Sequence, residues 1–170
     1  EPMLRTAMGG IEGTYVESQL LIMERNGYPE ETYYTFSYSP IPDDHGAVGG
    51  IFCANTDDTD RVIGERQLAL LKDLAARTAD ARTFDDACRL SAISLQNDRH
   101  DFPFALMYLA EQAPNRFVLA ATSGIEPNRM AAAGYALDSA SVWPLAEVIC
   151  TQRPSVISDL SRLFDHLPTG

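Results

Sequence analysis

The chain has 170 residues, 45% of them hydrophobic, which is enough for one ordinary domain or two small ones with a real core. Its formal net charge of −11 argues against binding to nucleic acid, whose phosphates need a basic face, and against an anionic membrane surface. With no apolar run of about 18 residues and no secretory leader, the sequence predicts a cytoplasmic segment that does not enter a membrane.

The acidic residues are unevenly distributed along the chain. Residues 1–60 hold eleven acids and two bases, whereas residues 61–101 hold seven of each. This change predicts a boundary near position 60, followed by a solvated helical face. The three cysteines (Cys53, Cys88 and Cys150) are odd in number and far apart, so we expect small buried hydrophobic side chains rather than a disulfide framework or a zinc site.

The first third of the chain predicts a helix end and a three-stranded antiparallel meander. Residues 1–10 have the spacing of a helix that stops at two glycines. Strands are expected over Thr14–Arg25, Tyr33–Ser39 and Ala47–Ala54, with Asn26-Gly27 as the first turn. The middle strand alternates aromatic and hydroxyl side chains strictly, which is typical of a half-buried strand.

Two helices are predicted next. The first runs from Arg61 to about Asp80, with an apolar stripe that includes Ile63, Leu70 and Leu74 and is narrow enough for a two-helix seam. The second begins after Thr83, a favourable N-cap, and ends before Asn97.

The last third predicts a hairpin and a short helix. Its expected elements are strands at Phe104–Ala110 and Phe117–Ser123, a short strand at Tyr135–Leu137, a helix capped by Ser141 with Pro144 in its first turn, and a brief strand at Ser155–Ser158.

Residues 14–61 resemble the C-terminal half of a PAS domain. The resemblance rests on "ETYYTFSYSPIPDDHGAVGGIFCANTDDTDR", in which a turn with Gly46 joins two strands and Asp57 and Thr59 form a DxT exit. In PAS domains the aspartate and threonine of this motif resemble a latch that holds the final strand to the helix that follows it. Both side chains can bond nearby backbone groups at such a junction.

Residues 66–165 resemble the N-terminal part of a GAF domain, through "LALLKDLAARTADARTFDDACRLSAISL", "FALMYLAE", "FVLAATSGIEP" and "WPLAEVICTQRPSVISDL". The predicted fold is therefore α+β, with a partial PAS-like domain at 1–60, a connecting signalling helix at 61–80 and a partial GAF-like domain at 81–170. Both sheets would be incomplete, so we expect self-association or coverage by further chain. The chain begins with Glu1-Pro2, which suggests a piece of a longer protein.

The resemblance implies the sensory region of a bacterial two-component or hybrid sensor histidine kinase. The implied partners are a second copy in a homodimer, downstream kinase and receiver domains, and a small-molecule ligand. ATP is expected only in the kinase part of the parent, and no cofactor is identified for this chain. The alternatives are the same sensor pair with another output (a cyclic-dinucleotide enzyme, a serine phosphatase or a transcription regulator) or a stand-alone enzyme.

Catalytic and metal-binding residues are not predicted. His100-Asp101-Phe102-Pro103 imitates a phospho-acceptor motif, but its proline comes too early and the segment reads as a loop. Near His45 and His166 the sequence has no nucleophile or metal ligand that could form a site with either histidine. Ligand-pocket candidates are the alternating strand residues Leu106, Tyr108, Leu119 and Ala121.

Overall fold

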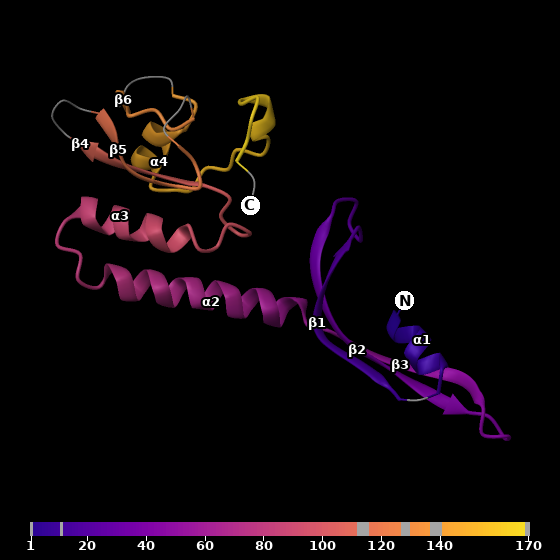
Figure 1. Cartoon of the computed structure of the whole chain (residues 1–170). Helices are drawn as coiled ribbons and strands as arrows, with labels where there is room; N and C mark the ends of the chain where they lie inside the picture. Colours follow the sequence, from indigo (N-terminus) through magenta and orange to yellow (C-terminus); the bar gives the residue numbers. More distant parts are fainter. Residues whose placement is uncertain (1, 11, 112–115, 127–129, 137–140, 169–170) are drawn as a thin grey trace. The chain divides into compact units, whose positions relative to one another are not determined.

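The computed structural model describes residues 2–10, 12–111, 116–126, 130–136 and 141–168. These residues form an α+β chain with two three-stranded antiparallel sheets (Figure 1). The chain divides into two compact units, Glu1–Leu68 and Ala69–Gly170. The division falls inside one long helix, α2 (Thr59–Thr78).

The first unit is an antiparallel meander with a short helix. It contains α1 (Pro2–Met8), β1 (Thr14–Met23), β2 (Glu30–Pro42) and β3 (Val48–Asp57), followed by the first half of α2. The strands pair in the order β1-β2-β3, which confirms the predicted meander. β2 and β3 are longer than expected, because ladder pairing continues to Glu30 on β2 and to Asp57 on β3.

Both hairpin turns of this sheet are built from residues suited to turns. Gly27 has a φ of +86°, a left-handed conformation that glycine adopts without strain. In the second turn, one carboxylate oxygen of Asp43 accepts hydrogen bonds from the amides of His45 and Ala47, at 2.8 and 2.9 Å. Such side-chain bonds to nearby backbone replace the ladder bonds that stop at the turn.

A β-bulge interrupts the pairing of β1 with β2. The register shifts between Val16 and Gln19, and Ser18 within the bulge has a φ of 47°. A non-glycine residue in this region is uncommon and needs contacts that hold it. The Ser18 amide donates to the Thr35 hydroxyl oxygen at 2.9 Å, which fixes the bulge against β2.

Few side chains of the first unit are fully buried. Among its described residues these are Ala7 and Thr32, and the Thr32 hydroxyl donates to the Leu21 carbonyl at 2.7 Å. The aromatic residues of β2 are half-buried, but Thr35 and Ser37 between them are half-buried too, so burial does not alternate as the period of two predicted. Large apolar side chains remain exposed on the outer strands: Tyr15, Leu20, Leu21, Ile22 and Phe52.

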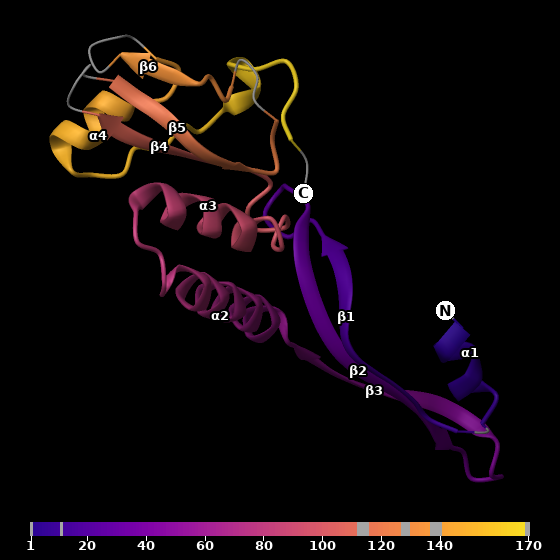
Figure 2. The ribbon, with the colours of Figure 1, turned by 60° about the vertical axis from the view of Figure 1, so that its left-hand side comes forward.

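The second unit combines a small sheet with helices (Figures 1 and 2). Its elements after α2 are α3 (Phe84–Leu95), β4 (Ala105–Glu111), β5 (Arg116–Ser123), β6 (Gly134–Ala136), α4 (Leu145–Thr151) and a 3-10 turn (Leu160–Arg162). The strand order β4-β5-β6 is antiparallel throughout, which confirms the predicted hairpin. Leu137, in the predicted third strand, lies outside the described residues.

Helix α3 packs against β4 and β5. It begins as predicted: the Thr83 hydroxyl oxygen accepts from the Asp86 amide at 3.0 Å and satisfies one of the unpaired donors of the first turn. Its inward side buries Ala92, Ser94 and Leu95.

Two predictions for the C-terminal region were wrong. Ser141 does not cap α4, because its hydroxyl donates to the nearby Trp143 carbonyl and the helix begins after Pro144. The segment Ser155–Ser158 is not a strand: it has no ladder pairing, and the sheet of this unit consists of β4, β5 and β6.

Candidate functional site: a strand-to-helix junction and an apolar cavity

The sheet of the first unit leads into helix α2 through a single residue, Asp58. The predicted exit residues meet at this point: a carboxylate oxygen of Asp57 accepts from the Thr59 amide at 3.0 Å. The Thr59 hydroxyl oxygen in turn accepts from the amide of Tyr33, at 3.0 Å, on the neighbouring strand β2. The Asp58 amide donates to the Tyr33 carbonyl at 2.8 Å, so the ladder continues to the first residue before the helix.

Asp57 is held as a carboxylate by several donors. Its second oxygen accepts from the Tyr34 hydroxyl at 3.0 Å and from the Arg25 guanidinium at 3.3 Å. Hydrogen bonds from Thr59 are the main cause that lowers the pKa of Asp57 to about 2, with Tyr34 and Arg25 adding to the effect. The side chain therefore stays charged at all ordinary pH values.

Asp58 forms a second set of bonds, toward strands β1 and β2. Its carboxylate accepts from the Thr35 hydroxyl, from Ser18 Oγ at 3.5 Å and from Arg61 Nε at 3.4 Å. Arg61 also donates from Nη2 to Ser18 Oγ at 2.7 Å, and thereby joins the first turn of α2 to the β1 bulge. The Thr35 bond, with Arg61, lowers the pKa of Asp58.

The sequence analysis did not predict this second set of hydrogen bonds, which joins Asp58 to β1 and β2. Asp58 follows a strand and could be recognised as a capping residue. Ser18 and Thr35 are 40 and 23 positions away from it, however, and no local pattern marks them. Only the register of the bulged β1–β2 pair brings them together.

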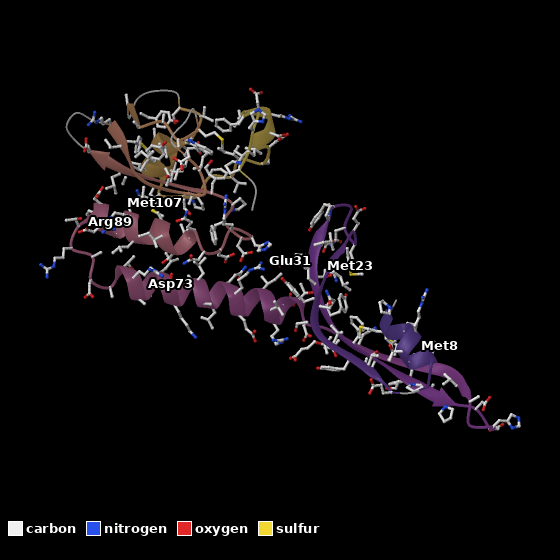
Figure 3. The ribbon with its side chains drawn as sticks, in the orientation of Figure 1. Met8, Met23, Glu31, Asp73, Arg89 and Met107 are labelled. Atoms are coloured by element: carbon white, nitrogen blue, oxygen red, sulfur yellow. The ribbon has the colours of Figure 1, made fainter. Side chains whose placement is uncertain are left out.

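A third tie lies one turn further along α2. Arg66 donates to both carboxylate oxygens of Glu31 on β2, at 2.7 and 3.1 Å, and both side chains are only about a quarter exposed. The Tyr33 hydroxyl donates to Glu31 at 2.6 Å, and this bond is the main cause that raises the pKa of Tyr33. Figure 3 labels Glu31 on β2.

The side chains that were predicted to form the helix seam are largely covered by other residues of the same chain. Leu70 is 8% exposed, and Ile63 and Leu74 are half-buried. By contrast Leu68 and Leu71 are 51% and 63% exposed. A partner on α2 would therefore meet these two leucines, because the Leu70 side chain is already covered.

The pKa of Asp73 on α2, labelled in Figure 3, is lowered mainly by its bond with Arg77. The Arg77 guanidinium lies 2.8 Å from the Asp73 carboxylate.

The second unit contains an apolar cavity of about 720 Å³ between β4, helix α4 and the segment that follows α4. Leu106 and Tyr108 line it, as predicted. Leu119 and Ala121 are half-buried on β5 and do not line it. The register between β4 and β5 shifts between Met107 and Tyr108, where Ala120 of β5 is the extra residue, and simple alternation failed as a guide to the lining.

Aromatic residues from three different segments meet around this cavity. The Trp143 ring stacks on Phe164 with centroids 5.6 Å apart and lies 6.4 Å from Phe104. The Trp143 indole N–H donates to the Met130 carbonyl and the Tyr108 hydroxyl to the Ala132 carbonyl, each at 2.8 Å. Burial is the main cause that raises the pKa of Tyr108.

No group of three His, Cys, Asp or Glu side chains in the described part of the chain could hold a metal ion. His45, His100 and His166 are exposed and lie outside helices and strands. Cys53 and Cys150 are exposed and Cys88 is half-buried, which corrects the expectation that all three are buried.

Within the described ranges, each helix is too short or too polar to cross a membrane. Comparison of the sequence with protein-family models and with curated proteins finds no match.

Proposed function

We propose that the chain is a sensory and signal-transmission segment, in which the sheet of the first unit controls the position of helix α2. The observation that carries this proposal is the Asp57–Thr59 exit, where a helix residue accepts a hydrogen bond from the Tyr33 amide of β2. A change in strand packing would alter this bond and so shift the start of the helix. The ties from Asp58, Arg61 and Arg66 to β1 and β2 support the same coupling.

The proposed parent is a two-component sensor histidine kinase, with a PAS-like segment at 1–60, a connecting helix at 61–80 and a GAF-like segment at 81–170. ATP and the phospho-acceptor would belong to downstream kinase and receiver domains. The proposal rests on the sequence patterns together with the junction. We place this segment in the cytoplasm, where its three unpaired cysteines would stay reduced.

We propose also that the segment works as a homodimer, joined along the exposed side of α2. Leu68 and Leu71 share this side with Gly64 and Ala75, at the spacing of three and four that suits a coiled-coil seam. Substituting both leucines with Asp should convert a dimer to a monomer in light scattering. A monodisperse monomer before substitution would refute the homodimer.

The relay is tested in the parent protein with Asp57→Ala and Thr59→Ala. Autophosphorylation from ATP is the readout, circular dichroism checks the fold, and Thr56→Ala, an exposed site on β3, is the matched control. Both exit variants should change the rate several-fold while the control does not. Unchanged rates in both would remove the latch, and a parent without autophosphorylation would refute the kinase output.

A further inference from the structure

The turn between β1 and β2 contains two residues that can react with each other. Asn26 is followed directly by Gly27, and both residues are exposed in the turn between Met23 and Glu30. We infer that Asn26 is a deamidation site, at which the Gly27 backbone nitrogen attacks the side-chain carbonyl carbon of Asn26 and the product carries a carboxylate. Only the effect of this modification on the helix junction rests on the proposed function.

The reaction is an intramolecular substitution that needs only water and a base. The Gly27 amide loses its proton to the solvent, its nitrogen forms a bond to Cγ of Asn26, and the bond from Cγ to Nδ2 breaks. The Nδ2 group takes up a proton and leaves as ammonia, and a five-membered succinimide ring remains. Water then opens the ring at either carbonyl carbon, which gives aspartate or isoaspartate.

Gly27 leaves its own amide nitrogen open to this reaction. A side chain on the residue after an asparagine shields the attacking nitrogen, and glycine has no side chain. Among the described residues, apart from its two chain neighbours, none has a heavy atom within 4 Å of the position that a Cβ of Gly27 would take. Solvent base therefore reaches this amide.

Asn26 is the only asparagine of the sequence that precedes a glycine. Asn55 is exposed as well, but it precedes Thr56 and pairs with Phe36 in the ladder of β2 and β3. Its backbone is held by that ladder, and the amide that would attack it carries a stiff β-branched side chain. We therefore expect Asn26 to react much faster than Asn55.

Glu30 gives the reaction a structural consequence. One oxygen of its carboxylate accepts from the backbone amide of Asn26 at 2.9 Å and from Asn26 Nδ2 at 3.0 Å. Deamidation replaces the Nδ2 donor with a carboxylate oxygen, so an attractive contact becomes a repulsion between two anions. The Glu30 carboxylate then moves away from residue 26.

Arg25 connects this turn with the helix junction. Its guanidinium lies 3.3 Å from the Glu30 carboxylate and 3.3 Å from that of Asp57. A new carboxylate next to Arg25 competes for the same guanidinium, so the contact of Arg25 with Asp57 weakens. The modification would thereby act on the Asp57–Thr59 exit.

The site is tested on the native chain by peptide mapping. Trypsin cleavage after Arg25 and Arg61 releases residues 26–61, so that Asn26 and Asn55 are compared within one peptide. After incubation at mildly basic pH we expect aspartate and isoaspartate at position 26, at a rate that rises with pH and is at least tenfold above that at Asn55. Equal rates at the two asparagines, or an unmodified Asn26, would overturn the site.

Two glycines provide matched variants. Gly27 and Gly46 lie in the two hairpin turns of the same sheet, with φ of +86° and +82°. Gly27→Ala should slow the conversion of Asn26 at least fivefold, because its methyl group shields the amide nitrogen. Gly46→Ala imposes similar backbone strain and should leave that rate unchanged. Equal rates in the two variants would contradict attack by the Gly27 nitrogen; should Gly27→Ala fail to fold in thermal melting, the comparison of Asn26 with Asn55 decides.

Asn26→Asp makes the aspartate product directly and tests the effect on Glu30. The amide of residue 26 should exchange with solvent several-fold faster than in the unmodified chain, relative to an unfolded peptide of the same sequence. Adding Glu30→Gln exchanges the amide and the carboxylate between the two positions and should restore the protection. An Asn26→Asp variant with unchanged exchange would refute the repulsion.

The link with the relay is tested in the parent protein. Asn26→Asp should change autophosphorylation several-fold. A normal rate in this variant, in a parent whose rate responds to Asp57→Ala, would refute the effect on the junction. A parent that does not respond to Asp57→Ala would refute the relay, whereas the peptide map alone decides the modification site.

Discussion

Replacing Thr59 with Val should loosen the junction at one identifiable bond. Valine keeps the shape of threonine but cannot accept the hydrogen bond from the Tyr33 amide, which is part-buried and 3.0 Å from the hydroxyl oxygen. A part-buried donor that loses its acceptor costs about 1–3 kcal/mol. Since Thr59 is half-buried and water can partly replace the hydroxyl, we expect the lower part of this range, about 1–2 kcal/mol.

Amide hydrogen exchange measures this change at the bond itself. Because every 1.4 kcal/mol is tenfold in an equilibrium, the Tyr33 amide should exchange about 5- to 30-fold faster in T59V. T59S keeps the hydroxyl and should retain protection. T56V makes the same substitution at an exposed β3 position and should leave Tyr33 unaffected. Equal Tyr33 exchange in T59V and T56V would refute the reasoning.

Three further predictions follow from caps, charges and exposure. The pKa of Asp57 is lowered to about 2 in the folded chain, so the stabilising contribution of its carboxylate is present above about pH 4 and is lost as the pH falls toward 2. Urea unfolding at a series of pH values should show this loss of stability. The D57N variant should lack this pH dependence. Thr83→Ala removes the α3 cap and should cost about 1 kcal/mol in the unfolding of the second unit, whereas Thr83→Ser should not. A thiol reagent should modify Cys53 and Cys150 rapidly and Cys88 slowly, because burial raises the pKa of the Cys88 thiol; three equal rates would contradict the placement.

Local patterns predicted most of the elements. The strand β2, the turn at Asn26-Gly27 and the cap at Thr83 were each predicted from nearby residues alone, and each is present in the structure. The Asp57–Thr59 exit was also within reach, because both residues act on backbone groups at the strand end.

Features that depend on register between distant strands could not be predicted. Ser18 enters the junction only because a bulge turns it toward Asp58, and the bulge has no glycine to mark it. The bulge at Ala120 of β5 likewise has no local signal in the sequence, and Leu119 beside it does not line the cavity. Serine is a residue type that often caps helices, but the Ser141 hydroxyl donates to the Trp143 carbonyl instead of capping α4.

The coupling of sheet and helix is tested most directly by a distance distribution between two spin labels within the first unit. One label is placed on the exposed native Cys53 of β3 and one on Q67C, an exposed position of α2 in the first unit, after Cys88 and Cys150 have been replaced by Ser. The account predicts a narrow distribution that broadens when D57A and T59V are combined and stays narrow with T59S. Equal widths in all three proteins would contradict it.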